Sequence, residues 1–266
     1  MLDKYNRDIS YLRISVTDRC NLRCTYCMPE EGIDLMAHED VLSFEEIINF
    51  VEEAVKTGIT KIRLTGGEPL VRKGIIELVE RIAKVEGLED LALTTNGILL
   101  EKYAEELAKA GLKRVNISLD TLNPDAYREI TRSGNIDDVF KGIHAAKQAG
   151  LKPIKINCVR MPDSSETELI ALKAFCKEND LDLRFIRQMD LETGDFSIVE
   201  GGQGGNCKIC NRIRLTANGK VKPCLFNQNE FDVKQLGAKE AIKKTIESKP
   251  EEGSSNKIGK FYNIGG

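Results

Sequence analysis

Three cysteines stand close together near the start of the chain, Cys20, Cys24 and Cys27, with the spacing Cx3Cx2C. They follow residues 13–16, a short apolar segment that is typical of a buried strand. Three thiolates at this spacing can bind three irons of a [4Fe–4S] cluster and leave the fourth iron open to a small chelating ligand. Zinc prefers four ligands, and no histidine or fourth cysteine lies near in the sequence, so a closed zinc site fits poorly. A disulfide would leave one thiol over, and an accidental grouping of three thiols is the remaining alternative.

A second set of three cysteines, with the spacing CxxCx13C, consists of Cys207, Cys210 and Cys224. The pair Asn218-Gly219 between two apolar runs predicts a β-hairpin that returns Cys224 to the side of the first two. This set therefore predicts another cluster site, with zinc completed by a distant Cys158 or Cys176 as the alternative. Cys158 and Cys176 lie on a predicted apolar strand and an amphipathic helix, where buried free thiols are ordinary.

Composition limits the classes of function. The chain has 266 residues, 41% of them apolar, and a formal net charge of −3, which argues against general nucleic-acid binding. No apolar run approaches the ~20 residues of a membrane span, and the polar N-terminal residues give no indication of a signal peptide. Eight cysteines in such a chain indicate a reducing, cytoplasmic location and metal binding rather than disulfides.

The elements that must position the cysteines form a repeated helix–strand pattern. Ser43 and Glu46 predict a capping box at the start of the first helix, and Gly58 suits its left-handed end. Short apolar strands are predicted at 13–16, 61–65, 91–94, 115–118, 154–157 and 183–186. Six such units predict an α/β fold, a partial (β/α)6 TIM-type barrel, with an ordinary doubly wound sheet as the alternative.

We expect this barrel to span residues 1–190, and a small C-terminal domain with its tail to span residues 191–266. The glycine-rich segment 201–205 and residues 250–260 are predicted to be flexible connectors.

Candidate ligand-binding residues follow the strands, because barrel chemistry gathers at the carboxyl ends of strands. The second strand ends in Gly66-Gly67-Glu68, where paired glycines would let backbone amides approach an amino-acid-like ligand and Glu68 could accept from its ammonium group. Thr94 and Ser118 end the third and fourth strands. Taken alone, each of these segments is more often a turn than a site.

Basic residues inside otherwise apolar strands are a second signal: Arg13, Lys61, Arg63, Lys155 and Arg184. A buried cation must be paired, and these strands offer few carboxylates. Together the five indicate an anion bound in the barrel mouth, although Lys and Arg commonly cap helix ends or reach solvent instead.

The cysteine loop, with Tyr26 before its last cysteine, resembles the signature of the radical S-adenosylmethionine (SAM) enzymes. The wider run from Leu12 to Pro29 resembles, within that group, the GTP 3′,8-cyclase family of molybdenum cofactor biosynthesis. The segment from Cys207 to Cys224 is similar to the auxiliary-cluster motif of the same family. The resemblance implies two [4Fe–4S] clusters, held by the two cysteine sets, and SAM as cofactor.

The resemblance also implies roles for individual residues. Contacts to SAM are implied for Tyr26, Gly66, Gly67, Glu68, Ser118 and Met189. Contacts to the purine triphosphate are implied for Arg13, Lys61, Arg63, Thr94, Lys155, Arg184, Arg212 and Arg214. The terminal Gly265 and Gly266 resemble a tail that inserts into the active site, and they are expected to be catalytic because glycines can enter a narrow mouth.

The implied reaction converts GTP to (8S)-3′,8-cyclo-7,8-dihydroguanosine 5′-triphosphate. In the family a 5′-deoxyadenosyl radical abstracts the ribose 3′ hydrogen, and the carbon radical attacks C8 of guanine. The implied partners are a reductant such as flavodoxin or ferredoxin and a downstream cyclic pyranopterin monophosphate synthase, with the enzyme a monomer or homodimer.

Two departures from the family pattern keep other functions open. The stretch between Met189 and Cys207 is much shorter than in the family, and Arg187-Gln188 replace an acidic-then-apolar pair. The alternatives are a two-cluster radical SAM enzyme acting on another substrate, such as a peptide, and a non-catalytic zinc or iron–sulfur protein.

Overall fold

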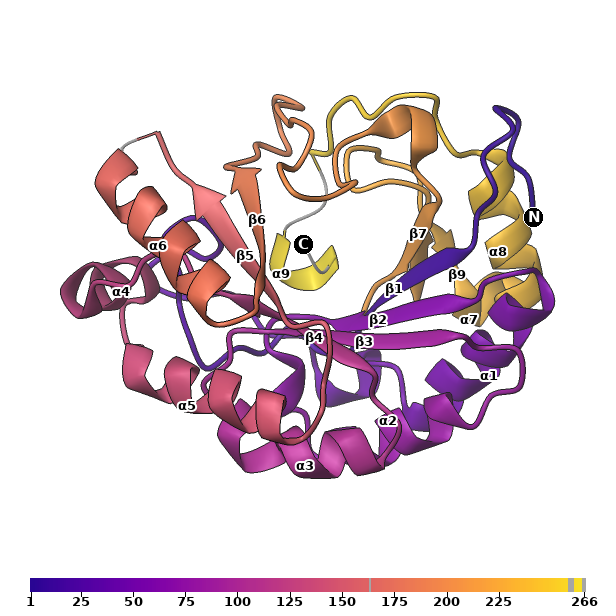
Figure 1. Cartoon of the computed structure of the whole chain (residues 1–266). Helices are drawn as coiled ribbons and strands as arrows, with labels where there is room; N and C mark the ends of the chain where they lie inside the picture. The colour runs from indigo at the N-terminus through magenta and orange to yellow at the C-terminus, as the bar shows by residue number, and fades with distance from the viewer. Residues whose placement is uncertain (163, 258–260, 265–266) are drawn as a thin grey trace.

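The computed structural model describes residues 1–162, 164–257 and 261–264. A strongly curved sheet forms a crescent, with α1 to α6 on its convex face and the short helix α9 on its concave side (Figure 1). The sheet order is β6-β5-β4-β3-β2-β1-β7-β8-β9. The strands are β1 (Tyr11–Ser15), β2 (Lys61–Thr65), β3 (Asp90–Thr95), β4 (Arg114–Ser118), β5 (Lys155–Arg160), β6 (Asp182–Arg187), β7 (Arg212–Leu215), β8 (Lys220–Lys222) and β9 (Phe231–Asp232).

The first six strands confirm the predicted partial barrel. They are all parallel and lie side by side in the order of the sequence. A doubly wound sheet would reverse its strand order at a switch point, so that alternative is wrong. The helices are α1 (Phe44–Lys56), α2 (Ile75–Ala83), α3 (Leu100–Lys109), α4 (Pro124–Thr131), α5 (Ile136–Gln148), α6 (Glu166–Glu178), α7 (Val233–Leu236), α8 (Ala238–Glu247) and α9 (Phe261–Ile264).

Local sequence explains how these units begin and end. At the start of α1, Ser43 Oγ accepts from the Glu46 amide at 3.2 Å, and Glu46 Oε2 accepts from the Ser43 amide at 2.7 Å. The predicted capping box is therefore present. Gly58 follows α1 with φ of 101°, a conformation that favours glycine, and the chain then enters β2.

The sheet continues beyond residue 190. β7 pairs in parallel with β1, and β8 pairs antiparallel with β7 across the turn at Asn218 and Gly219. The predicted hairpin is confirmed, with Gly219 in the left-handed region at φ of 82°. The second cysteine set is thus attached to the sheet that carries the first, and a domain boundary at residue 190 stays a prediction.

The glycine-rich segment 201–205 is packed against the sheet rather than loosely connected to it. A Cβ on Gly201 would lie 2.4 Å from the Leu183 carbonyl oxygen of β6. Glu200 and Phe185 exchange backbone hydrogen bonds of 3.0 and 3.1 Å. The expected connector is therefore part of the wall beside β6.

The described part of the second expected connector, 250–257, is also tied down. Asn256 is buried and donates from its side chain to the Leu225 carbonyl at 2.8 Å. Arg7 donates to the carbonyls of Pro250 and Glu251 at 2.6 and 2.9 Å. Sequence composition predicted the lack of helix and strand here, but not these distant contacts.

Among the described residues, no helix combines the length and the apolar character needed to cross a membrane.

Candidate active site

The concave face of the sheet is polar, because side chains along each strand alternate between the two faces. Arg13 of β1 lies between Arg63 of β2 and Arg214 of β7 in the strand register. Asn116 of β4 pairs in register with Lys155 of β5. The alternate positions, such as Leu12, Ile14, Ile62 and Leu64, are buried in the core beneath the helices.

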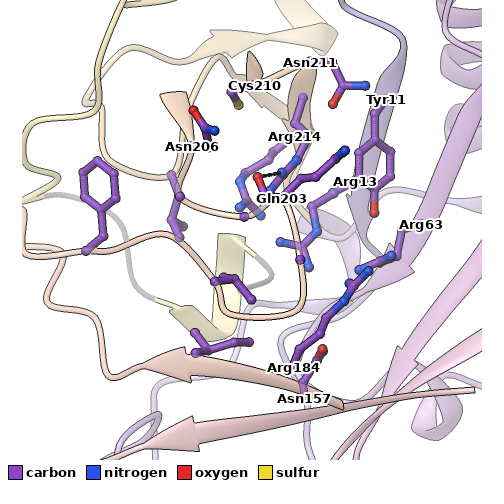
Figure 2. Close-up of a pocket in the computed structure, with 18 of the residues that line it drawn as sticks. Tyr11, Arg13, Arg63, Asn157, Arg184, Gln203, Asn206, Cys210, Asn211 and Arg214 are labelled. Carbon is purple, nitrogen blue, oxygen red and sulfur yellow. Dashed lines mark hydrogen bonds between the residues drawn. The ribbon is translucent and has the colours of Figure 1, made fainter. Parts of the chain in front are cut away.

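A cavity of about 570 Å³ opens on this face. Figure 2 shows Arg13, Arg63 and Arg184 pointing into the same space. The cationic side chains that line it are Arg13, Lys61, Arg63, Arg114, Lys155, Arg184, Arg212 and Arg214. Asp90 is the one carboxylate among the described lining residues, and it forms an ion pair with Arg114. The cavity is therefore strongly positive.

Several of these cations have side-chain nitrogens without a partner among the described residues. Lys155 pairs with Asp182 at 3.2 Å, but the buried Nε atoms of Arg13, Arg63 and Arg184 have no hydrogen-bond partner among the described residues. Burial and the neighbouring guanidinium of Arg214 hold the pKa of Arg13 well below its usual range. Crowded, desolvated cations of this kind are what an anion would stabilise.

Tyr11 is a lining residue that charge alone did not predict. Its ring lies 5.6 Å from the Arg63 guanidinium and 5.9 Å from that of Arg212, so it orders two of the cations. Its buried hydroxyl has no partner in the described part of the chain. The spacing of two residues from Arg13 on the same strand was the signal that could have identified it.

The N-terminal cysteine loop, Cys20 to Cys27, follows β1 and is held by the end of α4. The Arg23 and Thr25 amides donate to the carbonyls of Thr131 and Ile130 at 3.2 and 2.9 Å. Arg132, at φ of 64°, donates to the carbonyl of Arg23 at 2.7 Å. These bonds fix the backbone that presents the three thiols.

Tyr26 joins this loop to the end of β4. Its hydroxyl donates to Asp120 Oδ2 at 2.8 Å, and Asp120 Oδ1 accepts from the Val159 amide at 2.7 Å. Burial raises the pKa of Asp120 to about 6. Burial, Asp120 and the neighbouring thiols raise the pKa of Cys24 to about 12, and burial raises that of Cys27 to about 11.

The two predicted SAM-contacting glycines bring β2 against the cysteine loop. A Cβ on Gly66 would lie 2.5 Å from the Thr17 carbonyl oxygen, and one on Gly67 would lie 2.3 Å from that of Arg19. The Gly67 and Glu68 amides donate to these same two carbonyls, each at 2.8 Å. The Gly67 amide is therefore hydrogen-bonded within the chain, and the expected contacts of Gly66 and Gly67 to SAM stay a prediction.

Glu68 is buried and braces the ends of β2 and β3. Oε1 accepts from the Leu70 amide at 3.0 Å and from Thr95 Oγ1 at 2.9 Å, while Oε2 accepts from the Asn96 amide at 2.7 Å. Burial raises its pKa to about 7. A carboxylate has about four acceptor sites, so one remains for the expected ammonium group. The Asn96 side chain in turn lies 4.0 Å from Cys20 Sγ.

The C-terminal cysteine hairpin, Cys207 to Cys224, lines the cavity with all three thiols. Burial would raise the pKa of Cys210, but Lys249 and Arg212 outweigh it and the pKa is lowered. Lys249 is buried and donates to Cys210 Sγ at 3.5 Å. This lysine lies 39 residues from Cys210, and no local pattern in the sequence indicated it.

The thiols of each cysteine set are the type of ligand that an iron–sulfur cluster takes. All eight cysteines are free thiols. Within the described residues, no three Cys, His, Asp or Glu side chains are close enough together to bind one ion. Cys158 and Cys176, which the zinc alternative would need as an extra ligand, belong to the apolar core, as expected for buried free thiols. The sulfur atoms that bind a cluster lie farther apart than the ligands of one ion, because each thiolate binds a different iron.

Other predicted residues lie at neighbouring positions. Met189 lines the cavity, whereas Thr94 and Ser118 stand on β3 and β4 outside its lining, with Thr94 Oγ1 buried and without a partner among the described atoms. Ile264 of α9 packs against Leu225 and Phe226. Gly265 and Gly266 lie outside the described residues.

Comparison with known proteins agrees with this geometry. The Radical SAM superfamily profile matches residues 14–176, and the Molybdenum Cofactor Synthesis C profile matches residues 184–261. The structure of SuiB from Streptococcus suis bound to S-adenosylmethionine superimposes with a TM-score of 0.68 at 19% identity, over 94% of this chain and 66% of that one. This likeness shows the fold.

Among the more similar relatives are proteins named GTP 3′,8-cyclase. That of Thermodesulfovibrio yellowstonii is 44% identical over 94% of this chain and 95% of its own length, and that of Moorella thermoacetica is 44% identical over 88% and 86%. The first alignment runs over 305 positions, more than the 266 residues of this chain, so the relative has residues that this chain lacks. The chain is thus a radical SAM enzyme of the GTP 3′,8-cyclase family, in a shortened form.

Proposed function

We propose that this protein converts GTP to (8S)-3′,8-cyclo-7,8-dihydroguanosine 5′-triphosphate for molybdenum cofactor biosynthesis. The observation that carries the proposal is the cavity whose described lining has eight cationic side chains and one carboxylate, which is already paired with Arg114. A triphosphate supplies the missing negative charge, and arginine forks match phosphate oxygens. The relatives that are 44% identical carry the name of this reaction.

The two cysteine sites have different roles in the proposed reaction. Cys20, Cys24 and Cys27 would hold a [4Fe–4S] cluster with SAM, which together supply a 5′-deoxyadenosyl radical when bound and reduced. Cys207, Cys210 and Cys224 would hold a second [4Fe–4S] cluster in the wall of the cavity. Arg63, Arg184 and their neighbours bind and orient the nucleotide, so that the ribose lies between the two sites.

No side-chain acid–base pair is required from the cavity. Its task is to hold the nucleotide while the sheet and the segment 201–205 exclude water. Arg212 is oriented for this by its donation to the Gln203 carbonyl at 2.8 Å.

The tail completes the proposed site. Ile264 and Phe261 pack with Leu225 and Phe226 next to Cys224, which supports entry of the following Gly265 and Gly266 into the mouth. Removing these two glycines should leave SAM cleavage intact and abolish the cyclised product. A truncated enzyme that formed product at full rate would refute the catalytic role of the tail.

The deciding experiment is anaerobic incubation of reconstituted protein with SAM, dithionite and GTP, followed by mass spectrometry of the nucleotide. A cyclised nucleotide supports the proposal. SAM cleavage without any change in GTP would instead favour a two-cluster enzyme for another substrate, such as a peptide. Equal binding of GTP and guanosine would show that the cations do not read phosphates.

The remaining assignments follow from this function. We expect a cytoplasmic monomer or homodimer, reduced by flavodoxin or ferredoxin, whose product is consumed by cyclic pyranopterin monophosphate synthase. SAM contacts are proposed for Tyr26, Gly66, Gly67, Glu68, Ser118 and Met189, and nucleotide contacts for Thr94 and Lys61 in addition to the cavity arginines and Lys155.

A further inference from the structure

Lys249 is a buried lysine that the proposed reaction does not use. It follows the end of α8, where its amide donates to the Ile246 carbonyl at 3.2 Å. Its side chain passes from this helix to the cysteine hairpin and is 1% exposed. Burying an ammonium group is costly unless it is fully hydrogen-bonded, so its partners show what it does.

An ammonium group has three donors, and each one here has an acceptor on the hairpin. Nζ lies 2.7 Å from the Arg212 carbonyl, 2.7 Å from the Pro223 carbonyl and 3.5 Å from Cys210 Sγ. Arg212 begins β7 and Pro223 precedes Cys224, so the lysine joins both arms of the hairpin. The three bonds place one positive charge beside a thiol that lines the cavity.

None of the buried lysine's acceptors is a carboxylate. Lys222, the other fully buried lysine among the described residues, is instead paired with Glu230 at 3.0 Å. The charge of Lys249 is therefore directed at the sulfur and two carbonyl oxygens, and it remains available to stabilise negative charge on whatever Cys210 binds.

We propose that Lys249 is a positioning residue for the second cluster, which orients the Cys210 thiolate and raises the reduction potential of that cluster. The inference rests on the proposed second cluster at Cys207, Cys210 and Cys224. Hydrogen bonds to cluster sulfurs and nearby positive charge both favour the reduced, more negative state. In the protein without nucleotide, the reduction potential of the second cluster should therefore be raised relative to that of the N-terminal cluster. The N-terminal site has no such lysine among its described contacts.

The test isolates the second cluster in a full-length chain that carries Cys20→Ala, Cys24→Ala and Cys27→Ala. Iron and sulfide analysis first establishes whether this protein binds a [4Fe–4S] cluster at all. If it binds none, the second cluster is wrong and the inference falls with it. If it binds one, the midpoint potential of its one-electron reduction is measured by mediated titration with electron paramagnetic resonance, before and after Lys249→Met.

We expect Lys249→Met to keep the cluster and to make its reduction about tenfold less favourable, a shift of about 59 mV to lower potential. Lys249→Arg keeps the charge and the donors, so its midpoint potential should lie much closer to that of the wild type than the potential of Lys249→Met does. Lys220→Met is the matched control, since Lys220 lies on the same hairpin, is ion-paired with Asp232 of β9 and has no described bond to a cysteine. An unchanged potential in Lys249→Met would overturn the proposal and leave the lysine as a simple tie between helix and hairpin.

A methionine variant that loses the cluster is resolved by the arginine variant. Full iron content and a potential near that of wild type in Lys249→Arg would support the charged hydrogen bond as the requirement. Loss of iron in both variants, with wild-type circular dichroism, would show that the shape of the lysine matters and not its charge, and would overturn the proposal.

Discussion

The two cysteine sites differ in the charge that surrounds them. At the N-terminal loop Asp120, which accepts a hydrogen bond from Tyr26, and the neighbouring thiols add to burial in raising the pKa of Cys24 to about 12. At the C-terminal hairpin, Lys249 and Arg212 oppose burial and lower the pKa of Cys210. Cys24 and Cys210, one thiol of each set, thus lie in opposite electrostatic surroundings.

This contrast suits two different tasks. The N-terminal loop is braced by hydrogen bonds from α4 and β4 and lies outside the lining of the large cavity. The C-terminal hairpin forms part of that lining, among arginines that would bind an anion. A positive site next to the nucleotide and a separate site for SAM would keep substrate binding and SAM cleavage independent, and the following experiments test that separation.

The largest expected effect comes from removing one thiol at each site. Cys24→Ala should abolish SAM cleavage and remove half of the reconstituted iron, because two thiolates cannot retain the cluster. Cys224→Ala should lose the other half of the iron, keep SAM cleavage and form no cyclised nucleotide. The readouts are iron analysis, 5′-deoxyadenosine and product by chromatography. Cys158→Ala, in the core, should keep all of its iron; wild-type SAM cleavage in Cys24→Ala would contradict the assignment.

The next effect tests the positive cavity. Arg63→Ala removes a buried guanidinium whose Nε has no partner in the described chain, and should weaken GTP binding about 10- to 100-fold, with SAM cleavage unchanged. Arg63→Lys should recover only part, since it restores charge without the fork. Calorimetry with GTP measures both. Arg81→Ala on the surface of α2, paired with Glu45 at 2.8 Å, serves as control; equal losses in both variants would exclude a specific role.

A smaller effect concerns the acidic surroundings of the N-terminal loop. The pKa of Glu68 is about 7 in the fold against an ordinary 4.5, so the folded state favours the protonated acid. The stability that this contributes is fully present below pH 4.5 and is lost as pH rises through 7. Between pH 5 and 8 the free energy of unfolding of the iron-free protein should fall by about 2 kcal/mol from this group.

Urea unfolding at several pH values measures this slope. Glu68→Gln should flatten it, although the variant will be less stable overall because an amide cannot accept all three hydrogen bonds. Glu86→Gln, at an exposed position after α2, should leave the slope unchanged. A slope that survives Glu68→Gln would assign the pH dependence to other groups, such as Asp120.

The smallest expected effect is that of Tyr26→Phe. It removes the 2.8 Å hydrogen bond to Asp120 and should lower the free energy of unfolding by about 1 kcal/mol while increasing the SAM concentration needed for half-maximal cleavage. Thermal unfolding and SAM titration measure the two. Tyr103→Phe on α3, whose hydroxyl bonds to no described side chain, is the control. Unchanged SAM dependence would restrict Tyr26 to a packing role.

The sequence by itself predicted much of this molecule. The periodicity of apolar residues, the helix-capping residues and the glycines that end the helices predicted the six parallel strands. The Asn218-Gly219 turn predicted the hairpin that returns Cys224 to the other two cysteines. These features are local, because they depend on backbone conformations and spacings of a few residues. Basic residues at alternate strand positions also predicted the positive cavity, since the pleat places them on one face.

Only the tertiary structure decided which groups surround each set of thiols. Lys249 donates to Cys210 although the two are 39 residues apart in the sequence. Tyr11 of β1 contacts Arg63 of β2 and Arg212 of β7. Glu68, which the sequence placed as a ligand acceptor, turned out to bond to Thr95 and Asn96 at the next strand end. Such contacts depend on how the strands and helices pack together. The burial and the electrostatic field at a site come from all the residues around it, and these are neighbours only after folding.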